Sequence, residues 1–454
     1  MSDTMAAAPK TIDDLPSPPG LPILGDMLDF VSGEAPWDVM LRYAREVGPL
    51  SRVDLPGSDI VLVSDPDAIT QVMVTETAAY YKKTPTAALR PVSTDAGDVF
   101  TQPGGAVWAA RMATNPMVLA LKGDWLGQAL PAMQRDIAGR VGTFVGKSFG
   151  DTYHELLHMA FDVFSDMLYG TQFGDEAFGD WVTVASELDG RMKSKLPFML
   201  ASLGEKAQEA QDHIQRKFVA AVHTARVNPD KTGTDLLRHA LRAGCDHADD
   251  LLATELANMY YGGIVSSSTA VACTLYLLCK SDAEMKKVVA ALAALGPDPA
   301  PRAITGCAEL QAAVLEAMRI LPPVSLWTRN VHPAEPAVLG GYLLPPNTSL
   351  LIGSRFAHLN AAHWDEAETY KPARWTLERR AADPLGSAYF FPFGRGERTC
   401  FAQDVALAYI HLSVGTILLH TDPHVGEGRT IEQDFWFGTM VPKDLSAQFD
   451  AYPG

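Results

Sequence analysis

The chain has 454 residues, 47% apolar and 20% charged, and this composition is that of a folded globular protein rather than a disordered or fibrous one. Its 37 basic and 54 acidic residues give a net charge of −17, which argues against nucleic acid as a partner and against docking on anionic lipid, since both need a basic face. Five scattered cysteines without C-x-x-C spacing argue against a disulfide scaffold or a cysteine-rich zinc site.

The N-terminal segment carries Asp3, Asp13 and Asp14 and has no apolar core, so we expect neither a signal peptide nor a membrane anchor. The longest apolar run, 270–279, is about half the roughly 18 residues that a spanning helix needs. We therefore expect a cytoplasmic protein, and a monomer. Residues 1–25 form a Pro-rich lead-in, and 26–454 are expected to form a single domain.

The first part of the chain after this lead-in predicts short strands. The apolar runs 50–53 and 60–63 flank Pro56-Gly57, which favours a β-hairpin. Residues 84–106 are rich in Thr, Pro, Gly and Ala, and we expect a long irregular loop there; loops of this length are usually functional or disordered.

The middle of the chain is mainly helical. Hydrophobic residues recur with the period of an α-helix at 128–147, 154–169, 204–226, 247–279, 282–295 and 307–321. After Pro322-Pro323 the pattern changes to short strands, with a hairpin at 337–344 around Gly340-Gly341 and a strand at 349–352. A last helix is expected at about 401–419. These patterns predict a mainly α protein with a small β part, folded as one unit.

The loop 391–402, with the sequence FPFGRGERTCFA, is the sharpest local signal. Gly394 and Gly396 permit backbone conformations that other residues resist, which indicates a tight loop. Cys400 then stands at the N-terminus of an apolar helix, where the helix dipole and free amides favour a thiolate. Such a thiolate, with Arg398 beside it, suits the axial ligation of an iron. The alternative is a buried, inert cysteine next to a glycine-rich turn.

This loop resembles the heme-binding loop of the cytochrome P-450 family, F-x-x-G-x-R-x-C-x-G, with Phe393, Gly396, Arg398 and Cys400 in register and Ala402 in place of the last glycine. Three other segments agree in order and place. Residues 316–319 resemble the E-x-x-R helix, 370–375 resemble the P-x-R-F/W segment, and 18–25 resemble the Pro-rich lead-in of the longer members.

The resemblance implies the cytochrome P-450 fold and heme b, iron protoporphyrin IX, with Cys400 as the axial ligand of the iron. It implies a structural triad of Glu316, Arg319 and Arg374. It also implies heme contacts from Arg398, Arg329, Trp108, Phe393, Gly394 and Ala402. Arg111 comes one residue early for the family's W-x-x-x-R helix, so it could equally be an ordinary surface arginine.

The long helix departs from the family pattern A/G-G-x-D/E-T. Gly262 and Gly263 match the small residues, but Val265 stands at the position of the acid and Ser266 at that of the threonine. We expect the glycines to open space for dioxygen and Ser266 to offer it a hydrogen bond. Val265 removes the usual proton-relaying carboxylate, so protons would come through water, Ser267 or the substrate. A shifted register, with Thr269 at the hydroxyl position, fits the glycine pair less well.

The resemblance implies a monooxygenase that receives electrons from a ferredoxin or flavodoxin with its reductase. Arg395 and Arg398 are expected to give the face around Cys400 a positive charge that attracts an acidic partner. By analogy with the family, the loop 84–106 and residues 172–205 would line an apolar substrate pocket. Further pocket residues are expected to be Tyr260, Tyr261, Ile264, Val324, Leu326, Trp327, Phe437 and Met440. Such a pocket suits a terpenoid, steroid, fatty acid or polyketide.

Three alternatives stay open from the sequence. A heme-thiolate enzyme that uses peroxide, or that rearranges an oxygenated substrate, is motivated by Val265. A non-catalytic heme protein has the same ligand motif. A cysteine hydrolase based on Cys400 is disfavoured, because the motif places Arg398 and glycines nearby and no base.

Overall fold

The computed structural model describes residues 9–20, 26, 36–55, 58–81, 105–193, 204–228, 233–382, 385–426, 431–436 and 439–452. Helices dominate the chain, as predicted. The helices are α1 (Pro36–Glu46), α2 (Pro66–Thr70), α3 (Ala106–Thr114), α4 (Pro116–Lys122), α5 (Trp125–Gly142), α6 (Thr152–Tyr169), α7 (Gly174–Lys193), α8 (Glu205–Val227), α9 (Leu236–Arg242), α10 (Asp249–Cys279), α11 (Asp282–Ala293), α12 (Pro301–Thr305), α13 (Ala308–Ile320), α14 (Ser354–His358), α15 (Leu377–Ala382) and α16 (Gln403–His420).

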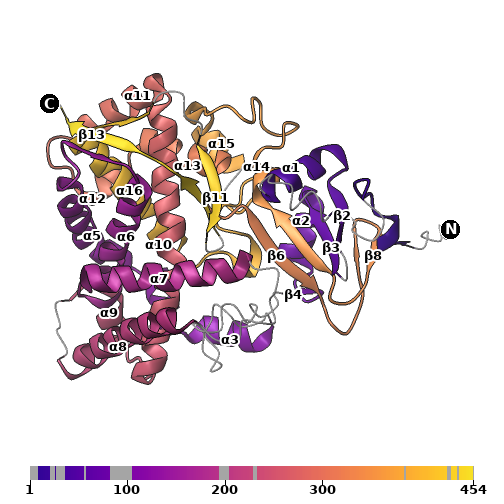
Figure 1. The fold of residues 1–454 in the computed structure, drawn as a ribbon, viewed down its shortest axis with the longest axis horizontal. Helices are drawn as coiled ribbons and strands as arrows, with labels where there is room; N and C mark the ends of the chain where they lie inside the picture. Colours follow the sequence, from indigo (N-terminus) through magenta and orange to yellow (C-terminus); the bar gives the residue numbers. More distant parts are fainter. Residues whose placement is uncertain are drawn as a thin grey trace.

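In the part of the chain that the structure describes, short strands form four small sheets. The largest has the order β2-β3-β9-β6-β4, with β3 and β9 parallel and the other pairs antiparallel. Figure 1 shows this sheet with α1 and α2 on one side of the molecule, and the long helices on the other. The strands are β1 (Lys10–Thr11), β2 (Leu50–Leu55), β3 (Ser58–Val63), β4 (Tyr80–Tyr81), β5 (Lys147–Phe149), β6 (Leu326–Val331), β7 (Ala337–Leu339), β8 (Tyr342–Leu344), β9 (Ser349–Gly353), β10 (Thr421–Val425), β11 (Glu432–Trp436), β12 (Thr439–Lys443) and β13 (Ala447–Ala451).

Both predicted hairpins are confirmed. In the pair β2–β3, Leu55 lies opposite Ser58. In the pair β7–β8, Gly340 and Gly341 have φ of 56° and 86°. A two-residue turn with two positive φ angles matches the right-handed twist of its strands, which is why a Gly-Gly pair stands there.

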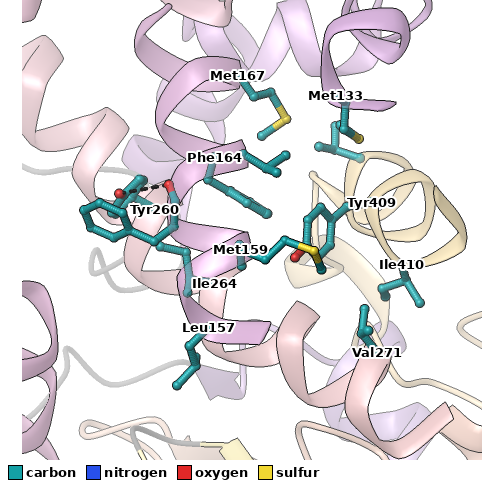
Figure 2. Packing of buried hydrophobic residues seen from close by; sticks show 14 of the residues in the cluster. Met133, Leu157, Met159, Phe164, Met167, Tyr260, Ile264, Val271, Tyr409 and Ile410 are labelled. Carbon is teal, nitrogen blue, oxygen red and sulfur yellow. Dashed lines mark hydrogen bonds between the residues drawn. The ribbon is translucent and has the colours of Figure 1, made fainter. Parts of the chain in front are cut away.

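Helix α10 is the centre of the helical part and packs on α6, α8, α13 and α16. It is apolar on all sides, as expected for a helix buried in a core. Figure 2 shows Phe164 and Met159 of α6 lying between Ile264 of α10 and Tyr409 of α16.

By length and composition alone, α10 could cross a membrane, although 72% of its apolar window is buried inside the protein. The sequence predicted only a shorter apolar run here. Glycine, serine and threonine interrupt the run without adding charge, so the helix has a longer uncharged stretch than its apolar residues suggest.

Candidate functional site

A cavity of about 500 Å³ lies between the middle of α10, strand β6, and the loop that leads into α16. Among the described residues that line it there is no Asp, Glu, His or Lys. The lining residues are Trp108, Met112, Leu121, Phe164, Met167, Leu168, Met259, Tyr261, Gly262, Gly263, Ser266, Ser267, Ala270, Met318, Pro323, Val324, Leu326, Trp327, Thr328, Arg329, Pro392, Phe393, Arg398, Thr399, Cys400, Phe401, Ala402, Val405, Ala406, Ile410 and Thr439.

Cys400 lines this cavity at the end of a loop whose backbone is closely fixed. The Cys400 N–H donates to the Phe393 carbonyl at 2.9 Å, and the Gly394 N–H donates to the Phe391 carbonyl at 3.0 Å. Burial raises the pKa of the Cys400 thiol, while the N–H of Ala402 opposes that shift. The amide thus acts in the direction that the sequence analysis expected, favouring a thiolate, while burial opposes it. A cation in the cavity would reverse that balance.

Gly396 and Arg395 join this loop to helix α2 and to η3 (Gln71–Thr75), the π-helical turn that follows it. Gly396 has φ of 69°, and a Cβ there would lie 1.9 Å from the Met73 carbonyl oxygen, so only glycine fits. The Arg395 guanidinium donates to the Gly386 carbonyl at 2.6 Å and to Thr70 Oγ1 at 2.9 Å. Arg395 is only 9% exposed, so the prediction that it offers charge to a docking partner is wrong.

His358 holds the beginning of the same loop, a role that the sequence did not indicate. Its Nε2 accepts the Phe391 N–H at 2.9 Å. Burial, helped by the nearby Arg319 charge, lowers the pKa of His358 to about 3. The imidazole is therefore neutral near pH 7, and Nε2 keeps the lone pair that this hydrogen bond needs.

Glu316 lies at the centre of a buried charge cluster behind the loop. Both Glu316 and Arg319 are fully buried, and two N–H groups of Arg319 donate to the two carboxylate oxygens at 2.8 and 2.9 Å. Arg374 Nε and the Lys371 N–H donate to Oε1 at 2.9 and 3.0 Å, and Trp375 Nε1 donates to Oε2 at 2.9 Å. The structure thus brings the three predicted triad residues together and adds Trp375, which the sequence analysis quoted but did not assign.

The two glycines of α10 have different surroundings. A Cβ on Gly263 would lie 2.5 Å from the Phe164 ring of α6, whereas a Cβ on Gly262 would meet nothing within 4 Å. Ser266 lies one turn further along the cavity wall, and its Oγ donates to the Gly262 carbonyl at 2.9 Å. Gly262 therefore widens the cavity, and Gly263 allows α6 to approach α10.

Val265, expected to be catalytic by its place in the motif, does not reach the cavity. Its side chain is 1% exposed in the hydrophobic core, and its carbonyl accepts the Tyr153 hydroxyl at 3.3 Å. Tyr153 also bonds Thr269 Oγ1 at 3.0 Å. Thr269 consequently faces α6 and not the cavity, which removes the shifted register as an alternative.

The predicted substrate pocket is partly brought together. Tyr261, Val324, Leu326 and Trp327 line the cavity. Three other expected residues do not line the cavity. The Tyr260 hydroxyl lies against Ser165 of α6, and Ile264 is in the core (Figure 2). Met440 is buried, and its N–H donates to the Pro323 carbonyl at 2.8 Å. Phe437 and most of the loop 84–106 lie outside the described residues.

Several cavity residues were missed by the sequence analysis. Phe164, Met167 and Leu168 of α6 are apolar residues at helical spacing, which is also the pattern of an ordinary core helix. Only the contact between Phe164 and Gly263 distinguishes them, and it joins positions about a hundred residues apart. Thr439, next to the expected Met440, lines the cavity in its place.

A comparison of the sequence with protein families identifies the family to which the chain belongs. The sequence profile described as Cytochrome P450 matches residues 15–446, nearly the whole chain. The chain belongs to the cytochrome P450 family. It is therefore an oxidoreductase of the P450 monooxygenase type, with a heme-thiolate cofactor.

Relatives and solved structures agree with this assignment. The P450 is 24% identical to premnaspirodiene oxygenase of Hyoscyamus muticus and 23% identical to the mitochondrial 1,25-dihydroxyvitamin D(3) 24-hydroxylase of Mus musculus. Each alignment covers 95% of this chain and 88% of the relative. The crystal structure of the cytochrome P450DA heme domain superposes with a TM-score of 0.81 at 19% identity, covering 96% of this chain and 97% of that one, which confirms the predicted fold.

The charged residues of the cavity suit a heme, whose two carboxylates need cationic partners. Arg329 and Arg398 are the lining residues that carry charge, and the Arg398 guanidinium lies 3.6 Å from the centre of the Trp108 ring. Burial lowers the pKa of both arginines, that of Arg398 to about 10 with help from Arg329, so an anion between them would be stabilising. Phe393 and Ala402 line the cavity beside them, and Gly394 lies behind Trp327.

Proposed function

We propose that this P450 inserts one oxygen atom of dioxygen into a hydrophobic small molecule of terpenoid, steroid, fatty-acid or polyketide type. The observation that carries the proposal is that Cys400 and the Gly262–Ser266 turn of α10 line one cavity. Apart from the two arginines, the described wall of that cavity is uncharged. A charged substrate would lose its hydration there without gaining a partner.

The cofactor is proposed to be heme b, with electrons from a separate ferredoxin or flavodoxin and its reductase. When bound, the heme supplies the activation of dioxygen. Cys400 would hold the iron, and Arg329, Arg398 and Trp108 would hold the carboxylates. A monomer in the cytoplasm stays our expectation.

Ser266 is the hydroxyl best placed to serve oxygen in the cavity. The Ser266 hydroxyl donates its proton to the Gly262 carbonyl, and its oxygen is free to accept a hydrogen bond from water. To donate a hydrogen bond into the cavity, the hydroxyl must first break its bond with the Gly262 carbonyl. Ser267 also lines the cavity, and its buried Oγ has no hydrogen-bond partner among the described residues. Ser266 can therefore hold a water molecule in the cavity, and this water would relay protons in place of the carboxylate of the family pattern.

A second candidate function is a heme-thiolate enzyme that uses peroxide or rearranges an oxygenated substrate. The lack of an acid on the described cavity wall favours it, because general acid–base help is worth roughly 10²–10⁴-fold in rate. The two functions differ in product formed per reduced nicotinamide consumed, measured with a ferredoxin system beside a peroxide-only reaction. If peroxide alone gives full turnover and the electron-driven reaction gives none, the monooxygenase proposal is wrong.

The assignment of Cys400 as the ligand of the heme iron is tested by the absorption spectrum of the reduced protein with carbon monoxide. We expect the red-shifted Soret band of thiolate-bound heme, and its loss in Cys400→His. Cys307→Ser, which changes a buried cysteine elsewhere, is the control and should keep the band. A band that survives Cys400→His would refute the assignment. Soret shifts induced by a lipid and terpenoid library then test the substrate class.

A further inference from the structure

The indole of Trp327 has an unused hydrogen-bond donor. Trp327 lines the cavity from β6, and its Nε1 is buried without a hydrogen-bond partner among the described residues. A buried tryptophan usually gives its N–H a partner, as Trp125 does with the Thr234 carbonyl at 2.8 Å. The missing partner is therefore expected to be something that occupies the cavity.

The strand places this donor beside a charged residue of the site. Successive side chains alternate across a strand, so Trp327 and Arg329 project from the same face of β6. They lie opposite Ile352 and Leu350 of β9. Arg329 is buried, and both residues line the cavity.

The loop before Cys400 fixes the ring. A Cβ on Gly394 would lie 3.2 Å from Trp327 Cη2 and 3.3 Å from Cζ3, so the six-membered ring lies against that glycine. Gly394 has φ of 77°, which independently requires glycine. The indole is wedged between β6 and the loop, and its orientation does not depend on a flexible side chain.

Arg111, which the sequence suggested as a possible heme contact, does not lie on the described cavity wall. Arg111 is not among the lining residues, and Met112, four residues after Trp108, is. Arg329 and Arg398 are then the cations of the described wall. The Arg329 guanidinium also donates to the Thr328 carbonyl at 2.9 Å, so not all of its N–H groups are available to a carboxylate, and a neutral donor can share the acceptor oxygens.

We propose that Trp327 Nε1 donates a hydrogen bond to the heme carboxylate beside Arg329. Trp327 is then a positioning residue of the cofactor, and not the substrate contact that its place in the sequence suggested. The inference rests on the proposed cofactor, because it needs a porphyrin with free propionates.

The test is Trp327→Phe, which keeps an aromatic ring and removes the donor. We expect heme to transfer to apomyoglobin roughly tenfold faster, the low end of the effect of one hydrogen bond to a charged acceptor. The propionate bending band in the resonance Raman spectrum should shift as well. Trp125→Phe removes an indole donor outside the cavity and should leave both readouts unchanged. If Trp327→Phe does not fold, Trp327→His, which keeps a ring N–H, should retain heme better than Trp327→Ala.

Reconstitution with heme dimethyl ester separates hydrogen bonding from packing. With the charge on the carboxylates removed, parent and Trp327→Phe should differ about twofold or less. A full tenfold difference with the ester would show that the ring acts by packing alone, and equal rates with ordinary heme would refute the proposal directly. A parent protein that shows no thiolate-type spectrum would refute the proposed function; a normal parent with an unaffected variant refutes only the role of Trp327.

Discussion

The two walls of the cavity are built by different means. Behind Cys400, the loop, the Glu316 cluster and His358 are joined by hydrogen bonds from buried charged or polar groups, and two glycines have positive φ. Across the cavity, α10 and α6 meet mainly through apolar side chains, with Phe164 against Gly263.

This difference explains where the chain follows its family and where it departs. A hydrogen bond to a buried carboxylate needs a particular donor at a particular place, so few other residues could replace those around Glu316. Apolar packing accepts other residues of similar volume. Val265 could therefore occupy the acid position at little cost in stability, since that position lies in the core and not on the cavity wall.

The largest expected effect is on the wall behind Cys400. Glu316→Ala should lower the free energy of unfolding by about 3–5 kcal/mol, because it leaves Arg319 buried without its partner. Thermal or denaturant unfolding of purified protein, together with heme content, measures it. Lys287→Ala, which breaks the more exposed pair with Glu284, should change little. Equal effects would mean that the cluster is not a distinct stabilising unit.

The opposite wall is tested by adding the acid. Val265→Asp should cost roughly 3 kcal/mol, because it removes a buried apolar group and places a carboxyl among apolar neighbours. It should not raise product formed per reduced nicotinamide, since the side chain does not reach the cavity. Val227→Asp on the exposed end of α8 is the control for the added charge. Improved coupling in Val265→Asp would show that α10 rearranges on cofactor binding.

Gly396→Ala tests how closely the loop is fixed. A left-handed conformation costs an alanine about 1–2 kcal/mol, and here the added methyl group also meets the Met73 carbonyl. Heme content should fall more than it does for Gly146→Ala. Gly146 has a similar φ of 73° and open space around it, so it isolates the backbone strain. Equal losses in the two variants would show that the contact with η3 contributes nothing.

The smallest expected changes in stability are those of alanine substitutions at the adjacent Gly262 and Gly263, which should have opposite signs. Gly262→Ala should stabilise the fold by up to about 1 kcal/mol, since alanine favours a helix and has room there. Gly263→Ala should destabilise the fold by about 1 kcal/mol net, because the clash of the added methyl group with Phe164 outweighs the gain in helix propensity. Phe164→Leu should rescue Gly263→Ala. Effects of equal sign for the two glycines would contradict the described packing of α6 on α10.

The sequence predicted most of this fold and about half of the site, for identifiable reasons. Helix α10 was expected at 247–279 because hydrophobic residues recur there with the helical period, and the hairpin at Gly340-Gly341 because glycines readily adopt the two positive φ angles of that turn. Cys400 was found because its loop has fixed spacing. Each of these signals is local in the chain.

The misses share a different cause. The sequence predicted Arg395 to be a surface charge, but its guanidinium donates to Thr70 and Gly386. Val265 was predicted to be a cavity residue, but it faces the core and its carbonyl accepts the Tyr153 hydroxyl. Ile264 and Met440 fail in the same way. Which face of an element is covered depends on partners far away in the chain, and composition and periodicity carry no record of them.

The bond between Arg395 and Thr70 joins positions 325 residues apart. Contacts of such separation form late, because the intervening chain must first lose its freedom, and during synthesis Arg395 leaves the ribosome long after Thr70. We expect the axial-ligand loop to be among the last parts to settle, so that chains interrupted before this point emerge unable to retain a cofactor. Cys400 itself follows Arg395, so only chains that extend past this loop carry the residue expected to hold the iron.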